Sequence, residues 1–268
     1  MDVVAALLMQ GGVARRSDLI ALGISRQSVA QALTEERITR PTRGVYAVHG
    51  ASPALLSASC AGADLACISA ASHQGLWILR EPSLIHVIVD HGRPLPESFR
   101  VHRQAKPLTM ADICVQSMRC LPELDALCIV ESAVVQKKVS LQNLRTLATG
   151  ARDAPLRRII ALVDPHAESI LETVGRYHLR DAGFHVSSQV SIPGVGRLDL
   201  FVDGILGIEA DGREHHSGPR EFEEDRRRWN LLTVKGIPVL RVSAKVILRE
   251  PKILVQLVRE GLATRKSQ

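Results

Sequence analysis

Three carboxylates lie close together in an otherwise apolar stretch of this chain. Residues 196–212, GRLDLFVDGILGIEADG, carry Asp199, Glu209 and Asp211 on two predicted strands that flank an Asp-Gly turn. Like charges held close on an apolar sheet repel each other unless a cation neutralises them. Carboxylate oxygens are the ligands that Mg²⁺ prefers, so the pattern predicts a divalent-metal site. A solvated hairpin face with scattered acids is the alternative.

The length of the turn decides which side chains share a face of this hairpin. A two-residue turn would place Asp199 and Glu209 on opposite faces, because side chains alternate along a strand. A three-residue loop over 202–204 places Asp199 opposite Gly207, with Glu209 diagonal to it on the same face and Asp211 beyond. We predict the three-residue loop, since Gly207 would then leave space for an ion above the sheet.

The composition limits the class of protein. A length of 268 residues suggests about two domains, and a hydrophobic content of 46% is sufficient for buried cores. No apolar run reaches the roughly 18 residues that a membrane-spanning helix needs. The N-terminal MDVVAALLMQGG has no basic region before its apolar stretch. We therefore expect no signal peptide, no membrane partner and a cytoplasmic location.

The cysteines and histidines do not follow a familiar metal-binding spacing. The five cysteines form no C-x-x-C pair and lie among apolar residues, at Cys60, Cys67, Cys114, Cys120 and Cys128. We interpret them as reduced core thiols rather than as disulfides or zinc ligands. Four histidines of the same region are dispersed, and we expect structural roles for them: His73, His86, His91 and His102.

The N-terminal residues and the net charge indicate a DNA-binding module. The charge of +6 fits a nucleic-acid partner. Residues 1–50 predict three helices, the third opening after the N-cap Ser25, and then a β-hairpin with a turn over 41–44. This is the order of a winged helix-turn-helix, in which the third helix enters the major groove and the hairpin wing touches the DNA backbone.

Five side chains of this module are candidates for contacting DNA. Arg26, Gln27 and Gln31 belong to the third helix and would face the bases, whereas Arg40 and Arg43 would serve the wing. A small helical domain used for protein contacts is the alternative, since winged helices also act as dimerisation modules.

The rest of the chain predicts a mixed α/β organisation. Residues 51–164 predict a small α/β unit followed by helices, with a boundary near 164–165. Residues 165–268 predict the order α-β-β-β-α-β-α. Glu168 and Glu172 are four residues apart and share a face of the first of these helices. Glu172 is the candidate for the site and Glu168 is expected at the surface.

Residues 165–260 resemble the very-short-patch-repair-like (Vsr-like) endonuclease domains of the PD-(D/E)XK nuclease superfamily. The matching pieces are the acid in ESILETVGRYHLRDAG, Gln189 in SSQV, GRLDL, the run EADGREHH, EDRRRWNLL and GIPVLRVS. The first 150 residues are similar to the antitoxin domains of AbiEi-type toxin–antitoxin systems. RRSDLIALGISRQSVAQAL, the wing RGVYAV and SAASHQGLWIL carry that second resemblance.

The nuclease resemblance implies a metal-dependent core. Asp199 and Glu209 would ligate Mg²⁺ or Mn²⁺ beside the Ala210 carbonyl, and Glu172 would reach in directly or through water. The superfamily has a lysine two residues after the glutamate, where this chain has Asp211. The loss of a positive charge and the gain of a negative one favour stronger metal binding, and we predict two metal ions bridged by Asp199.

Two further residues complete the implied catalytic set. A histidine assists in Vsr-like domains, and His216, or His215, is the candidate to activate water or protonate the leaving oxygen. Arg228 could hold a phosphate or pin Asp225. The alternatives are that the two histidines cap their loop and that Arg228 is a structural ion-pair residue.

The combined prediction is an α/β chain in three parts. A winged helix-turn-helix (1–50) and a small AbiEi-like α/β and helical region (51–164) precede a restriction-endonuclease-like core (165–268). We expect a metal-dependent DNA endonuclease, delivered to DNA by its own winged helix, in DNA repair or defence. The alternative is a DNA-binding regulator or antitoxin with a non-catalytic nuclease fold. DNA, a second copy of the chain, and a toxin or defence-locus protein are the partners considered.

Overall fold

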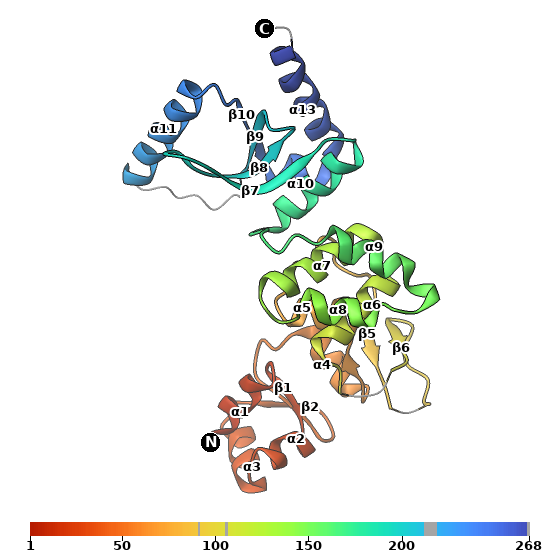
Figure 1. Cartoon of the computed structure of the whole chain (residues 1–268). Coiled ribbons are helices and arrows are strands. Elements are labelled where there is room, and N and C mark those ends of the chain that lie inside the picture. Colours follow the sequence, from red (N-terminus) through yellow and green to blue (C-terminus); the bar gives the residue numbers. More distant parts are fainter. Residues whose placement is uncertain (91, 105–106, 212–218, 267–268) are drawn as a thin grey trace. The chain divides into compact units, whose positions relative to one another are not determined.

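The computed structural model describes residues 1–90, 92–104, 107–211 and 219–266 (Figure 1). They form two compact units, Met1–Cys120 and Leu121–Gln268, each of mixed α/β structure. The α/β class is thereby confirmed, whereas the finer division at residues 50 and 164 stays a prediction. Within the described ranges, every helix is too short or too polar to cross a membrane.

The first unit opens with three helices and a small sheet. The elements are α1 (Val3–Met9), β1 (Val13–Arg15), α2 (Arg16–Ala21), α3 (Arg26–Thr34), β2 (Thr39–Thr42) and β3 (Val45–Ala47). The sheet has the order β1-β3-β2 and both pairings are antiparallel. Strand β1 was not predicted from the sequence. Val13 and Ala14 instead pair with β3 and are buried.

The helices of this segment are positioned by caps and by one core. The Ser25 hydroxyl accepts a hydrogen bond from the Ser28 N–H at 3.0 Å, as expected of an N-cap. Leu7, Leu19, Val29 and Tyr46 come from four different elements and share one buried cluster. Burial of the apolar face of α3 leaves its polar face exposed.

The second half of the first unit is a three-stranded sheet with helices. Its elements are α4 (Pro53–Cys60), β4 (Asp64–Leu65), α5 (Cys67–His73), β5 (Ile85–Ile88), β6 (Phe99–His102) and α6 (Met110–Cys120). Strand β5 is central, antiparallel to β4 and parallel to β6. These elements agree with the mixed α/β organisation predicted for this part of the chain.

The second unit begins with helices that pack on its later part. They are α7 (Glu123–Val135), α8 (Leu141–Leu147), the short 3-10 helix η1 (Ala151–Asp153) and α9 (Ala154–Leu162). Glu131 of α7 is fully buried and accepts hydrogen bonds from Arg176 at 2.5 Å and from the Thr173 hydroxyl at 2.6 Å. Both partners lie on α10 (Ile170–Asp181), so this buried ion pair ties α7 to α10.

The remaining elements surround a four-stranded sheet. They are β7 (Val186–Ile192), β8 (Gly196–Val202), β9 (Leu206–Asp211), α11 (Pro219–Val234), β10 (Val239–Ser243), α12 (Ala244–Arg249) and α13 (Pro251–Lys266). The sheet order is β10-β9-β8-β7, with β10 parallel to β9. Helices α10 and α13 lie on one side of this sheet and α11 on the other (Figure 1). The element order agrees with the predicted one except for the added α12.

The β8–β9 hairpin has a three-residue loop, but its register differs from the predicted one. Val202 pairs with Leu206, so the loop is 203–205 rather than 202–204. Gly207 therefore pairs with Phe201, and the predicted pairing of Asp199 with Gly207 is wrong. The loop moved by one residue because Asp203 and Gly204 adopt the left-handed φ values of 51° and 70°.

Gly207 does not leave the space that the prediction assigned to an ion. A Cβ at this position would lie 3.0 Å from Leu198 Cδ1 and 3.1 Å from Val239 Cγ2. The glycine therefore allows close packing of three strands, and the predicted ion position above it is wrong.

Candidate functional site

The candidate carboxylates come from one helix and two strands of the second unit. Glu172 lies in the first turn of α10, Asp199 on β8, and Glu209 and Asp211 on β9. Arg228 reaches them from α11. His216 and His215 lie outside the described residues, so their predicted role stays a prediction, and the same holds for the Asp225 side chain.

Glu172 is held by a network of donors. Its carboxylate accepts hydrogen bonds from Gln189 Nε2 at 2.7 Å, Ser169 Oγ at 2.8 Å and the Glu168 N–H at 3.1 Å. Burial raises the pKa of Glu172, and the bond from Gln189 opposes that rise. Gln189 has a φ of 53°, a strained conformation for a residue other than glycine, in the middle of β7. The backbone thus departs from regular strand geometry where the amide meets the carboxylate.

Asp199 and Ala210 are joined across the hairpin. The Asp199 Oδ2 atom accepts a hydrogen bond from the Ala210 N–H at 2.9 Å. This contact orients the carboxylate toward the end of β9 that carries Glu209 and Asp211. The predicted metal ligand Ala210 therefore contacts the site through its N–H in this structure.

Glu209 is the most perturbed acid of the group. Burial raises its pKa to about 7, while the Arg228 guanidinium opposes that rise. Arg228 donates to Glu209 Oε1 at 2.7 Å and also to the Arg197 carbonyl oxygen. Among the described residues, its buried Nε has no hydrogen-bond partner. The structure therefore contains an ion pair of Arg228 with Glu209, in line with the structural role that was the alternative for Arg228.

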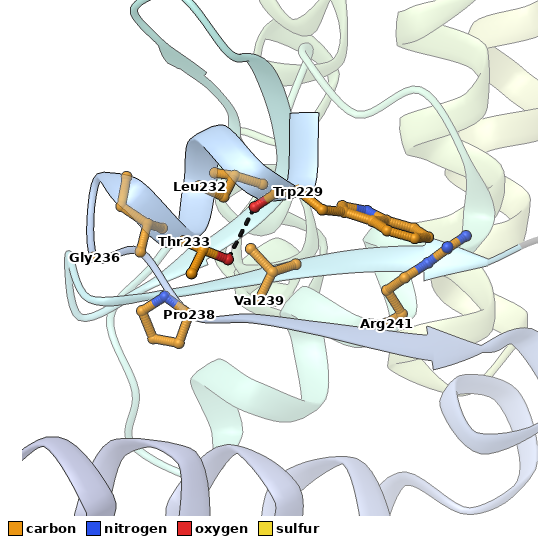
Figure 2. A pocket seen from close by; sticks show the side chains of 8 residues that line it. Trp229, Leu232, Thr233, Gly236, Pro238, Val239 and Arg241 are labelled. Carbon is orange, nitrogen blue, oxygen red and sulfur yellow. Dashed lines mark hydrogen bonds between the residues drawn. The ribbon is translucent and has the colours of Figure 1, made fainter. Parts of the chain in front are cut away.

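Asp211 lies beside an apolar pocket. Arg241 of β10 donates to Asp211 Oδ1 at 2.8 Å, and its guanidinium carbon lies 4.7 Å from the centre of the Trp229 ring. Trp229 and Arg241 form one end of a pocket of about 420 Å³, and Gly236 and Pro238 lie at its other end (Figure 2). The position where the superfamily has a lysine is therefore an aspartate paired with an arginine from the next strand.

The four acids do not converge as a preformed metal cage. In the part of the chain that the structure describes, they do not form a set of three ligands within 4.8 Å of one another. Each acid has its own hydrogen-bond partner, which is an arginine for Glu209 and Asp211 and an amide N–H for Asp199. The oxygen donors suit Mg²⁺ or Mn²⁺ in chemistry, but ion binding would require them to rearrange.

The five candidate DNA-contacting residues are all exposed. Arg26, Gln27 and Gln31 lie on the polar face of α3, and Arg40 and Arg43 lie on β2 and the turn that follows it. Gln31 donates to Glu35 at 2.8 Å. Arg26 and Arg40 line the same cleft, of about 350 Å³, between α3 and the hairpin. The helix and the wing thus present basic groups together.

The structure also gathers side chains that the sequence analysis did not connect. Cys67, His86, His102 and Cys120 of the first unit place their ligand atoms within 4.8 Å of one another. His86 Nδ1 and His102 Nε2 lie 3.1 Å apart, so the fold brings together two histidines that are dispersed in the sequence. Each of the four comes from a different element, so no short spacing in the sequence marks the cluster.

Comparisons with known proteins address the N-terminal segment. Residues 1–49 match the family model "Transcriptional regulator, AbiEi antitoxin". The expected similarity to AbiEi antitoxins is thereby confirmed for these residues, whereas the Vsr-like resemblance of the C-terminal part stays a prediction.

Two curated proteins of Mycobacterium tuberculosis are similar to a larger part of the chain. They are uncharacterized protein MT2308 (strain CDC 1551 / Oshkosh) and uncharacterized protein Rv2248 (strain H37Rv). Each is 28% identical over 162 residues, which cover 58% of this chain and 54% of the relative. The chain therefore spans about half the length of these curated relatives.

One solved structure also aligns with the chain. It is the crystal structure of the RV2827C protein from Mycobacterium tuberculosis, at 18% sequence identity and a TM-score of 0.28. The alignment covers 61% of this chain and 80% of that one.

Proposed function

We propose that the protein is a DNA-binding transcriptional regulator of the AbiEi antitoxin type. The observation that carries this proposal is the family match over residues 1–49, the segment in which sequence and structure expose basic and amide side chains. This was the alternative of the sequence analysis, and the comparisons favour it over the nuclease.

The exposed face of α3 supports direct contacts with bases. Val29 and Ala32 are buried, whereas Arg26, Gln27 and Gln31 are exposed. In the major groove, arginine donates two hydrogen bonds to guanine O6 and N7, whereas glutamine donates to adenine N7 and accepts from its N6 amino group. Gln31 would exchange its bond with Glu35 for such a contact. Since a recognition helix contacts bases with its N-terminal residues, Arg26 and Gln27 have the favoured positions.

The β2–β3 hairpin supports contacts with the DNA backbone. Gly44 has a φ of 83° and closes the tight turn that carries Arg43. Arg40 precedes it on β2, and both guanidinium groups are exposed. Phosphate contacts of this kind fix the position of a protein on the duplex but carry little sequence information. The wing would therefore add affinity and salt dependence rather than specificity.

Partners follow from the same proposal. An antitoxin-type regulator has a cognate toxin, so a toxin or another defence-locus protein is the partner that we propose beside DNA. A single winged helix contacts few base pairs, and a second copy of the chain on a two-fold site would double the contacts.

The test is selection of bound sequences from random duplex DNA with the full chain, followed by affinity measurements across salt concentrations. We expect Arg26→Ala to weaken binding by about 1–3 kcal/mol and to relax specificity at its base pair. Arg43→Ala should weaken binding to all sequences alike. It should also reduce the slope of log affinity against log salt concentration by about one. The exposed Arg259→Ala on α13 is the charge-matched control. Absence of salt-dependent binding by the wild type would overturn the proposal.

A metal-dependent endonuclease is the second candidate function, and the environment of Glu209 favours it. A carboxylate whose pKa is raised to about 7 is destabilised as an anion, and a divalent cation would relieve that destabilisation. Glu172, Asp199 and Glu209 are the residues that would hold Mg²⁺ or Mn²⁺. Such an ion would supply an activated water molecule for phosphodiester hydrolysis. Arg228 would then leave Glu209 and face a phosphate group.

The nuclease candidate is tested by nicking of supercoiled plasmid with Mg²⁺ or Mn²⁺. Metal-dependent cleavage that Asp199→Asn and Glu209→Gln abolish would establish it, with the exposed Glu224→Gln on α11 as the control. The absence of cleavage of duplex, single-stranded and mismatched DNA by the wild type would exclude it and leave the regulator.

A further inference from the structure

The first unit contains a cluster of two cysteines and two histidines that the proposed DNA-binding function does not use. Cys67 begins α5, His86 lies on β5, His102 ends β6 and Cys120 ends α6. Cys67 and His86 are buried, and His102 and Cys120 are half-buried. Two cysteines and two histidines are a combination that binds zinc in structural sites.

The distances within the cluster fit the edges of a tetrahedron. His86 Nδ1 lies 3.1 Å from His102 Nε2 and 3.8 Å from Cys120 Sγ. A tetrahedral zinc site with bonds of about 2.0–2.3 Å has ligand–ligand edges of about 3.3–3.8 Å. All four ligand atoms, including Cys67 Sγ, lie within 4.8 Å of one another. The longest separation in the cluster, up to 4.8 Å, would have to shorten by up to about 1 Å to match such an edge.

The backbone and a buried amide hold Cys67 in place. Cys67 has a φ of 47°, which is uncommon for a residue with a side chain and persists only where its surroundings enforce it. Its N–H donates to Gln116 Oε1 at 2.9 Å, and Gln116 Nε2 donates to Gln104 Oε1 at 2.9 Å. Groups that orient ligands in this way accompany metal sites.

His86 is fixed by its own backbone bonds. Its N–H donates to the Ser69 hydroxyl at 2.9 Å and its carbonyl accepts from the Ala66 N–H at 2.9 Å. Ligand strands and helices are therefore already in position.

We propose that Cys67, His86, His102 and Cys120 bind one structural Zn²⁺ ion in the first unit. Two thiolates and two neutral imidazoles balance the charge of a divalent ion, and this set is a common one for closed, four-coordinate zinc sites. The ion would join α5, α6, β5 and β6, and would add to the small hydrophobic core of this region. The interpretation of Cys67 and Cys120 as plain core thiols is thereby revised.

Sulfur ligands distinguish this site from the carboxylates of the second unit. Thiolate and imidazole select Zn²⁺, whereas carboxylate oxygens select Mg²⁺ or Mn²⁺. The zinc ion would have no open position for water, since four protein ligands complete its tetrahedron. Its role is accordingly stability of the fold, and it stands independently of whether the chain regulates genes or cleaves DNA.

The experiment measures metal in the full chain purified under reducing conditions. We expect one Zn²⁺ per chain by mass spectrometry of the elements. Replacement of zinc by Co²⁺ should give the visible bands of tetrahedral cobalt and an ultraviolet band from thiolate-to-cobalt charge transfer. That charge-transfer band requires cysteine ligands, so an ion on surface carboxylates would not produce it.

Two ligand variants and a matched control complete the test. Cys120→Ser and His102→Asn change half-buried ligands, and each should weaken Co²⁺ binding at least tenfold while far-ultraviolet circular dichroism shows folded protein. The exposed Cys60→Ser should bind like the wild type. No metal in the reduced wild type, a Cys67–Cys120 disulfide in its place, or equal binding by the ligand variants would overturn the proposal. If a variant does not fold, the charge-transfer band of the wild type decides alone.

Discussion

The two units of this protein each gather side chains of metal-binding types, but they gather them in opposite ways. In the first unit, four ligand atoms from four elements lie within 4.8 Å and include an imidazole pair 3.1 Å apart. In the second unit, Asp199, Glu209 and Asp211 are neighbours in sequence, yet each is held by a different donor. Among the described residues, the acids therefore lie near one another without forming a preformed set of metal ligands.

Charge accounts for the difference between the two clusters. Neutral thiols and imidazoles can approach one another inside a core before a metal arrives. Ionised carboxylates repel one another, and in this structure Glu209 and Asp211 are each paired with an arginine. A residue other than glycine has a positive φ at each site: Cys67 is a member of the first cluster, and Gln189 donates to Glu172 beside the second. Local strain thus accompanies each site.

We expect the largest effect on stability from metal removal, which would distinguish the two clusters directly. A zinc-selective chelator should destabilise the chain by more than about 5 kcal/mol, because binding energy of a structural zinc site is folding energy. Removal of Mg²⁺ should change the free energy of unfolding much less. Thermal unfolding of the wild type and of Cys120→Ser checks both statements. Equal responses of these two proteins to the chelator would contradict the expectation.

The next largest effect on stability is expected at Glu131, the buried acid that pairs with Arg176. Arg176→Met leaves Glu131 fully buried without its cation and should cost about 3–5 kcal/mol of stability in urea unfolding. The double variant Glu131→Gln/Arg176→Met should recover much of the loss. If the single variant were neutral, arginine pairing would not be what stabilises acids in this unit.

The pH dependence of the second unit should report Glu209. Its folded pKa of about 7 lies above the ordinary value of 4.5, so the folded state binds more protons than the unfolded state between these values. Stability therefore falls as pH rises from about 4.5 to about 7. Glu209→Gln should remove that fall, by on the order of 1–3 kcal/mol. Denaturant unfolding at several pH values measures this dependence, with Glu224→Gln as the control. The same dependence of unfolding free energy on pH in Glu209→Gln and in Glu224→Gln would contradict the prediction.

The smallest effect on stability is expected at the exposed ion pair of Asp211 with Arg241. Asp211 and Arg241 are each about two-fifths exposed as side chains, so Asp211→Asn should change stability by about 0–1 kcal/mol. A larger loss in urea unfolding would mean that the stacking of Arg241 on Trp229 depends on the carboxylate. Arg241→Lys, which keeps the charge but loses the planar stack, separates the two contributions.

The success of sequence-based prediction varied with the range of the interactions involved. The cap Ser25, the apolar periodicity of α3 and the Asp-Gly turn are local signals, and the structure contains each of them. Strand β1 and helix α6 were missed because long-range pairing and packing stabilise them. The predicted hairpin register was wrong by one loop position, because Asp203 as well as Gly204 adopts a left-handed φ.

The α/β class, the element order of residues 165–268 apart from α12, the exposed basic side chains of α3 and the presence of clustered acids could be predicted from the sequence. These features depend on periodicity, turn chemistry and charge over a few residues. Which of the cysteines and histidines meet depends on tertiary contacts. Cys67, His86, His102 and Cys120 are brought together by the β5–β6 pairing and by α5 and α6, and long-range pairings of that kind have no local signature in the sequence.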